Sequence, residues 1–268
     1  MPDIQIGVVG CAGRMGLNLL RLIDATDGCV ISGGSERPGH DTVGQDAGEL
    51  AGLGILGTIV DDNPHAMFER SDIILDFTVP AATVAHCALA TETNTKLVIG
   101  TTGTAPEDDA AIAKAAEAVA IMREGNMSLG VNVLAVLTER MARYLDEDFD
   151  IEIVEMHHRY KVDAPSGTAL LLGRSAAAGR GIDHDEVLQG GRHGITGERR
   201  RGDIGYAAIR GGNVAGEHSV IFAANDERVE LTHRATDRTI FARGALTAAR
   251  WLSDKQPGLY GMADVLGL

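Results

Sequence analysis

Four side chains that can carry a proton or a positive charge stand close together in the middle of the sequence. They are His157, His158, Arg159 and Lys161, which fall within five consecutive positions of a chain whose formal net charge is −14 at pH 7. A histidine near its ordinary pKa, or a lysine whose pKa is lowered by neighbouring cations, can donate a proton at neutral pH. So concentrated a cluster of cations in an acidic chain predicts a pocket for an anionic substrate.

The segment after this cluster predicts a place for a carboxylate group. Pro165 stiffens the approach to a helix, and Ser166 is a favourable N-cap residue. The first turn would then expose the N–H groups of Gly167 and Thr168. A substrate with two carboxylates would suit this arrangement, with one carboxylate held by the helix N-terminus and the other by a histidine or lysine. A small dicarboxylate is thus the expected substrate.

Plainer interpretations of the same residues stay open. The two histidines could end a strand with their hydrogen bonds satisfied, and Arg159 could be an ordinary surface charge. A metal site is disfavoured, because adjacent residues on a strand point to opposite faces and no carboxylate–histidine spacing supports one.

A glycine-rich segment near the N-terminus predicts a second kind of site. Gly10, Gly13 and Gly16 form a GxxGxxG pattern between an apolar run and a segment with helical spacing. Such glycines allow a tight turn, close approach of the backbone to a pyrophosphate, and helix N–H groups that point at anionic oxygens. Arg14 adds a cation, and Glu36 lies twenty residues past Gly16 at the end of the next apolar run. An acidic residue in that place accepts the ribose hydroxyls of NAD, so we expect a dinucleotide site.

Two residues of this segment leave alternatives open. Arg37 could receive the 2′-phosphate of NADPH, which Glu36 would repel, or it could be a solvated surface charge. Cys11 sits in the turn beside a helix N-terminus, which would favour its thiolate, although a packing role is the preferred interpretation.

Two further polar segments lie at the ends of predicted strands. Gly100, Thr101 and Thr102 come after the apolar run that starts at position 96, and the next run ends in Glu124, Gly125, Asn126 and Met127. Ligands bind outside the carboxyl ends of the strands in open parallel sheets, so both segments are candidates for nicotinamide or ribose contacts. Either could instead be a simple polar turn.

The order of predicted elements indicates two domains. Strands are expected over 4–10, 29–36, 71–78, 96–103 and 119–128, with helices over 14–26, 80–93 and 106–119. This alternation predicts a parallel, doubly wound, Rossmann-type sheet. A long helix over 130–145, an alternating strand over 150–159 and glycine-separated strands within 202–236 then predict an α+β domain with a mixed sheet. We expect a dinucleotide-binding domain over 1–127, with 237–268 packing back on it, and a substrate-binding and oligomerisation domain over 128–236.

Composition excludes several classes of protein. A hydrophobic content of 44% and a charged content of 23% are ordinary for a globular chain of 268 residues. The charge of −14 and the single Trp disfavour nucleic acid as a partner. We find no apolar run of about 18 residues, no signal-peptide pattern and no CxxC spacing among Cys11, Cys29 and Cys87. We therefore expect a cytoplasmic protein without membrane contact, in which Cys29 and Cys87 are small buried hydrophobes.

The motifs together resemble one enzyme family. Residues 155–169 read E-x-HHR-x-K-x-DAPSGTA, which closely resembles the signature of the dihydrodipicolinate reductases. The segments GCAGRMG, DFTVP, IGTTG, NMSLGVNV and GEHSVIFA are also similar to that family, so the resemblance covers nearly the whole chain. Tyr160 departs from the family pattern, where His is common, and Met127 stands where an aromatic residue is common.

The resemblance implies a reaction and a set of roles. It implies hydride transfer from NADH or NADPH to 4-hydroxy-tetrahydrodipicolinate with loss of water, in the diaminopimelate route to lysine, by a homotetramer built through the sheets of the substrate domain. His157 is then the proton donor or acceptor, Lys161 the second proton donor, and the substrate ligands are His158, Ser166, Gly167 and Thr168. The implied cofactor contacts are Gly10, Cys11, Ala12, Gly13, Arg14, Met15, Glu36, Arg37, Gly100, Thr101, Thr102, Glu124, Gly125, Asn126 and Met127.

Two other functions remain as alternatives. Another two-domain dehydrogenase, acting on an amino acid or a semialdehyde, would not need the HHR…K…PSGT arrangement. A redox sensor that binds NAD(P) without turnover would keep the glycine loop but would have no use for a proton donor beside a carboxylate site.

Overall fold

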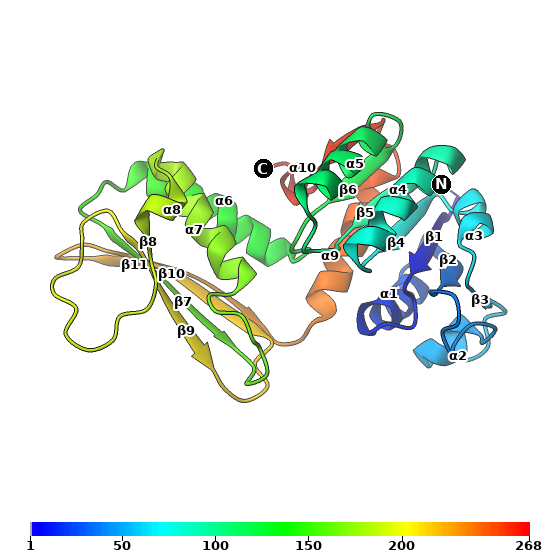
Figure 1. The fold of residues 1–268 in the computed structure, drawn as a ribbon, viewed down its shortest axis with the longest axis horizontal. Helices are drawn as coiled ribbons and strands as arrows, with labels where there is room; N and C mark the ends of the chain where they lie inside the picture. The colour runs from blue at the N-terminus through cyan, green and yellow to red at the C-terminus, as the bar shows by residue number, and fades with distance from the viewer. Residues whose placement is uncertain (1) are drawn as a thin grey trace. The chain divides into compact units, whose positions relative to one another are not determined.

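The computed structural model describes residues 2–268, which form two compact units (Figure 1). The N-terminal unit contains the chain up to Ser128 together with Thr239–Leu268, and the central unit is Leu129–Arg238.

The N-terminal unit is built on a parallel sheet with the order β12-β6-β5-β4-β1-β2-β3. Every neighbouring pair in it is parallel. Its strands are β1 (Ile4–Val9), β2 (Cys29–Ser35), β3 (Val60–Asp61), β4 (Ile73–Asp76), β5 (Lys96–Ile99), β6 (Ala120–Arg123) and β12 (Gly258–Tyr260). The chain adds β2 and β3 on one side of β1 and β4 to β6 on the other, so the direction of winding reverses beside β1. Ligands of doubly wound sheets bind at such a switch point.

Helices flank this sheet in two groups. α1 contacts α9, while α4 contacts both α3 and α5. The helices of the unit are α1 (Arg14–Asp24), α2 (Ala47–Ala51), α3 (His65–Arg70), α4 (Pro80–Thr93), α5 (Pro106–Ala116), α9 (Thr239–Leu252) and α10 (Met262–Leu266). The strands between them are short apolar runs, and residues such as Ile74, Leu97 and Ile121 are fully buried, as expected for a parallel sheet covered on both faces.

The central unit contains a mixed sheet with the order β11-β10-β7-β9-β8. β7 (Asp150–His157) is antiparallel to β10 (Gly216–Ala223), which is antiparallel to β11 (Arg228–Ala235). On its other side β7 is parallel to β9 (Ile204–Arg210), which pairs with β8 (Leu188–Gln189). The helices are α6 (Leu129–Tyr144), α7 (Gly167–Arg180) and α8 (His184–Val187), and α6 and α7 pack on each other and on the sheet. Burial alternates along β7, so its residues divide cleanly between a helix-covered face and an open face.

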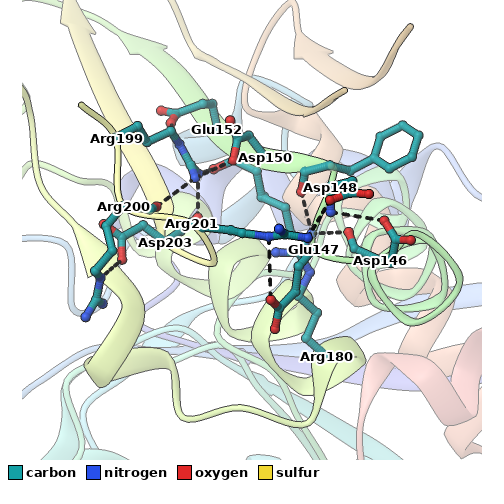
Figure 2. Close-up of polar contacts among 12 residues, drawn as sticks. Asp146, Glu147, Asp148, Asp150, Glu152, Arg180, Arg199, Arg200, Arg201 and Asp203 are labelled. Atoms are coloured by element: carbon teal, nitrogen blue, oxygen red, sulfur yellow. Dashed lines mark hydrogen bonds and ion pairs between the residues drawn. The ribbon is translucent and has the colours of Figure 1, made fainter. Parts of the chain in front are cut away.

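A cluster of arginines ties the segment after β8 to the open face of β7 (Figure 2). The guanidinium of Arg199 donates to Glu152 Oε1 at 2.9 Å, to Asp150 Oδ1 at 2.6 Å and to the carbonyl of Ile151 at 3.1 Å. Arg192 adds two bonds to the carboxylate of Glu152, at 3.0 and 3.1 Å. An otherwise exposed segment is thereby held to the sheet by charge-assisted hydrogen bonds.

The predicted fold class, a doubly wound parallel sheet with a separate α+β domain containing a mixed sheet, is confirmed. The sequence pattern did not indicate the short elements, which are β3, β8, β12, α2, α3, α8 and α10. Strands of two or three residues and single-turn helices are too short to show a periodic pattern. Cys29 and Cys87 are free and buried, as predicted. No helix within residues 2–268 has the length and apolar character needed to cross a membrane.

Candidate active site

The glycine loop between β1 and α1 forms a tight turn that requires small residues. Gly10 has a φ of +64°, a conformation that side chains disfavour. A Cβ atom on Gly16 would lie 2.4 Å from the carbonyl oxygen of Gly10, so only glycine lets the helix start this close to the turn. Gly13 is the N-cap of α1 and offers no side chain to the first turn. The helix N-terminus is therefore left open to an anionic ligand.

The carboxylate of Glu36 is directed at the same loop. Its Oε1 accepts the backbone N–H of Ala12 at 3.0 Å, and its Oε2 lies 3.4 Å from the backbone nitrogen of Arg37. The side chain of Arg37 is exposed. A glycine turn, an uncapped helix N-terminus and an acidic residue after β2 fit a dinucleotide, whose pyrophosphate and adenosine ribose need these groups.

Burial decides the state of Cys11 against the thiolate alternative. Its side chain is fully buried, and its Sγ would lie 2.9 Å from a Cβ atom on Gly34. Burial, assisted by the nearby charge of Glu36, raises the pKa of the thiol to about 12. The helix N-terminus does not outweigh this desolvation, so Cys11 is a packing residue whose backbone alone can face a ligand.

Several other predicted cofactor residues already use their side chains within the N-terminal unit. Thr101 is buried, and its Oγ1 donates to Asp76 at 3.2 Å. Glu124 accepts the backbone N–H of Gly125 at 3.1 Å, and Asn126 accepts that of Ser128 at 2.9 Å. Met127 is 2% exposed. Gly100 cannot carry a side chain, since its Cβ would lie 2.1 Å from the ring of Phe77, and Thr102 is exposed.

A buried acid at the end of β4 organises this region, although sequence reasoning missed it. Asp76 is fully buried and accepts hydrogen bonds from the Thr78 hydroxyl at 2.6 Å and from Nδ1 of His86 at 2.9 Å. Burial raises the pKa of Asp76, but these bonds outweigh it and hold the pKa below its usual value. The only signal in the sequence was an aspartate directly after an apolar run.

In the central unit, strand register brings the histidine cluster together. His157 is the last residue of β7 and lies opposite Arg210 of β9, while Glu155 lies opposite His218 of β10. Because side chains two apart on a strand share a face, Glu155 and His157 both point to the helix-covered side, where they are 1% and 8% exposed. Nδ1 of His157 is 2.6 Å from Oε2 of Glu155.

The carboxylate of Glu155 has two further partners. Arg210 binds it in a bidentate pair, with both bonds at 2.7 Å, and the backbone N–H of Ser166 donates to Oε1 at 3.1 Å. Burial alone would raise the pKa of Glu155. The hydrogen bonds from Arg210 and His157 lower it by more than burial raises it, so its pKa lies below the ordinary value. For His157, burial outweighs the attraction of Glu155 and lowers its pKa.

The N-terminus of α7 joins the same network. Ser166 is the N-cap, as predicted, with its Oγ accepting the N–H of Ala169 at 3.2 Å. The same Oγ lies 3.0 Å from Nε2 of His218, whose ring stands edge-on to His157 at 5.0 Å between centroids. Burial and the nearby His157 lower the pKa of His218 to about 4. The polar groups of Ser166 are thus hydrogen-bonded to other groups of the protein. Gly167 beside it is exposed.

The remaining predicted residues surround this network. Lys161 forms a bidentate ion pair with Asp163, at 2.8 and 2.9 Å. Nε2 of His158 lies 3.0 Å from the guanidinium of Arg238, and its Nδ1 is buried without a hydrogen-bond partner among the described residues 2–268. Thr168 lies in the first turn of α7. Sequence reasoning missed Glu155, Arg210, His218 and Arg238.

Comparisons with known proteins find the same family along the whole chain. Residues 4–127 match the family model described as the N-terminus of dihydrodipicolinate reductase, and residues 130–266 match the model of its C-terminus. A 4-hydroxy-tetrahydrodipicolinate reductase of Rhodopseudomonas palustris (strain BisB5) is 55% identical over 268 residues, covering 100% of this chain and 99% of the relative. The enzyme of that name from Dinoroseobacter shibae is 54% identical over 269 residues, covering 100% of both.

Solved structures show the same fold at lower identity. A dipicolinate-bound dihydrodipicolinate reductase from Paenisporosarcina sp. TG-14 is 21% identical, with a TM-score of 0.74 over 98% of this chain and 99% of that one. An amine dehydrogenase from Mycobacterium smegmatis is 15% identical, with a TM-score of 0.59 over 96% of this chain and 94% of that one.

Proposed function

Since the chain belongs to the dihydrodipicolinate reductase family, we propose that it reduces 4-hydroxy-tetrahydrodipicolinate to tetrahydrodipicolinate with NADH or NADPH, in diaminopimelate and lysine biosynthesis. The observation that carries this proposal is the full-length identity of 55% to a reductase of that name. The HHR…K…DAPSGTA segment adds the acid–base and carboxylate-binding groups that the reaction needs.

The N-terminal unit is the dinucleotide-binding part of this proposal. Gly10 to Met15 and Glu36 would hold the pyrophosphate and ribose, with Arg37 at the edge. Gly100 to Thr102 and Glu124 to Met127 would line the nicotinamide side, through backbone groups where their side chains are already bonded. A reduced nicotinamide, when bound, supplies the hydride.

The central unit is the substrate-binding part. Reduction places a hydride on one carbon and a proton on its neighbour, and His157 is the proposed proton donor. A side chain at position 216 would crowd its ring, because a Cβ atom on Gly216 would come within 3.1 Å of Nε2. His158, Ser166, Gly167 and Thr168 are the proposed substrate ligands, and the serine can serve only after its hydrogen bonds rearrange, because its hydroxyl and its backbone N–H are both bonded within the protein.

Lys161 is the proposed second proton donor, and Asp163 controls its availability. The two side chains form a bidentate ion pair that uses two of the three N–H donors of the ammonium group, so Lys161 can meet the substrate with its third donor or by exchanging Asp163 for a substrate group. A substrate carboxylate offers Lys161 an equivalent partner. The exchange replaces one ion pair by another and keeps its free-energy cost small.

The open face of the central sheet supports a homotetramer. Val154 and Met156 lie on the partly exposed face of β7, Ile209 of β9 is 47% exposed, and the edge strand β11 alternates between exposed and half-buried residues. A sheet with one uncovered face and a free edge commonly pairs with another copy. We place the enzyme in the cytoplasm, where its three unpaired cysteines stay reduced.

The test is the oxidation of NADH and NADPH, followed at 340 nm with freshly generated substrate. We expect turnover with both cofactors and none when the substrate is omitted. Cofactor binding without substrate-dependent oxidation would instead identify a redox sensor. Turnover only with an unrelated amino acid or semialdehyde would identify a different dehydrogenase.

A further inference from the structure

The carboxylate of Glu155 is saturated with donors. Its two oxygens accept one N–H from each of Nη1 and Nη2 of Arg210, the backbone N–H of Ser166 and the N–H at Nδ1 of His157, at 2.6 to 3.1 Å. Its side chain is 1% exposed, so bulk solvent does not reach these positions. A buried carboxylate with a bidentate arginine and a backbone donor stays ionised, and an ionised carboxylate can only accept hydrogen bonds.

This requirement settles which nitrogen of His157 holds the proton in the neutral ring. Because Glu155 can only accept, Nδ1 must carry hydrogen, and Nε2 is left with a lone pair. His218 does not bond to Nε2 of His157, since its own Nε2 is paired with the Ser166 hydroxyl and its Nδ1 has no hydrogen-bond partner within residues 2–268. Gly216 keeps the space beside Nε2 on the β10 side free of a side chain, since a Cβ atom there would lie 3.1 Å from Nε2.

We propose that Glu155, held by Arg210 and the N–H of Ser166, is a positioning residue that directs proton uptake to Nε2 of His157 when a dicarboxylate binds. The proton comes from solvent, resides on Nε2, and passes to the substrate carbon next to the one that receives the hydride. The inference rests on the proposed function only for this last transfer.

The charges around the ring explain why uptake accompanies binding. Glu155 on the same strand favours the imidazolium, whereas Lys161 on the following loop and Arg210 on β9 oppose it. His218 on β10 is neutral at ordinary pH and adds no charge. Burial and the two cations together hold the pKa of His157 below its usual value, which favours the neutral ring in the free protein. A dianion in the pocket offsets the cations and raises the pKa of His157.

Calorimetry measures the proposed uptake without any turnover. Pyridine-2,6-dicarboxylate, a planar analogue of the substrate, is titrated into NADH-saturated protein in two buffers of different ionisation enthalpy. We expect an uptake approaching about one proton per site for the wild type, and a several-fold smaller uptake in Glu155→Gln. The matched control is Glu152→Gln, which alters an arginine-bound carboxylate on the opposite face of β7 and should keep the wild-type uptake. Undiminished uptake in Glu155→Gln would overturn the proposal.

A spectroscopic measurement on the wild type needs no variant of Glu155 to fold. In protein labelled with ¹⁵N-histidine, the signals of His157 are those lost in His157→Gln. We expect the free protein to show the Nδ1–H tautomer, with Nε2 unprotonated. The opposite tautomer in the wild type would refute the positioning role, even if the reductase activity were established.

Kinetics connect the positioning role to the reaction. Activity requires protonated His157, so kcat falls as the pH rises through its pKa in the substrate complex. Removal of the Glu155 charge lowers that pKa, and the fall in Glu155→Gln should begin at lower pH, with kcat at neutral pH reduced at least about tenfold. Glu155→Asp, which keeps the charge, should restore part of the loss. An unshifted profile in Glu155→Gln would reduce Glu155 to a structural residue. If the Nδ1–H tautomer and the proton uptake are both observed but the protein shows no turnover, only the proposed function is wrong.

Discussion

Two glutamates three residues apart on β7 have similar partners and different surroundings. Glu155 and Glu152 are each bound by arginine side chains, and in both the pKa lies below its usual value because arginine hydrogen bonds outweigh burial. Glu155 faces the helices, is 1% exposed and holds a histidine, whereas Glu152 faces the open side, is 27% exposed and holds the segment after β8 (Figure 2). The difference shows that strand alternation, not residue type, separates a group suited to chemistry from one suited to anchoring.

The largest effect is expected on the Glu155 side of this comparison. His157→Gln removes the proposed proton donor, and Lys161→Ala removes the second. Loss of a general acid costs about 10² to 10⁴ in rate, so both variants should lose kcat while their affinity for NADH stays near that of the wild type. Steady-state kinetics and fluorescence titration with NADH measure the two quantities. Wild-type turnover in either variant would show that its assigned role is wrong.

On the open face of β7, we expect the loss of an arginine to lower the stability of the protein. Arg199→Ala removes bonds to Glu152, Asp150 and the Ile151 carbonyl, at a site where the arginine is only 17% exposed. Hydrogen bonds to charged groups contribute about 1.5 to 3 kcal/mol, and we expect the free energy of unfolding to drop by about that amount. Urea denaturation at fixed protein concentration measures it.

Arg201→Ala is the matched control for this prediction. Arg201 also contacts acidic side chains, but it is 64% exposed, so its removal should change the free energy of unfolding by less than about 1 kcal/mol. Equal losses in the two variants would mean that burial does not distinguish the two arginines.

The next prediction concerns His158, which directly follows the last residue of β7. His158 points away from Glu155 and lies 3.0 Å from Arg238 instead. If it binds a substrate carboxylate in the ground state and the transition state alike, His158→Ala should raise KM about tenfold and leave kcat nearly unchanged. The same variant should weaken competitive inhibition by pyridine-2,6-dicarboxylate. A fall in kcat at constant KM would instead place His158 in the chemistry.

The part of this organisation that sequence reasoning recovered is the part with a local pattern. The turn from Gly10 to Gly16, the Ser166 N-cap and the alternation of β7 depend on residues close in sequence, and each was predicted. Arg210 and His218 meet β7 through the register of β9 and β10, which no local pattern specifies. No pattern in the sequence marked Glu155 as a partner of His157, and only the structure supplies the arginine that keeps Glu155 ionised.

The smallest effect concerns a third carboxylate, which lacks an arginine clamp. Glu36 accepts a backbone N–H of the glycine loop, and Arg37 beside it is exposed. NADPH would bring a phosphate toward Glu36, and Arg37 offsets the repulsion, so we expect both cofactors to be used. Because an exposed charge pair is screened by solvent, Arg37→Ala should lower kcat/KM for NADPH by only about two- to fivefold, with a smaller loss for NADH. Glu36→Ala should do the reverse, since it removes ribose contacts and relieves repulsion of the phosphate.

Measurement of kcat/KM with both cofactors at two salt concentrations tests the reasoning, because the Arg37 effect must shrink as salt increases. Equal losses for NADH and NADPH in Arg37→Ala would leave Arg37 a solvated surface charge, and cofactor choice would then depend on Glu36 alone.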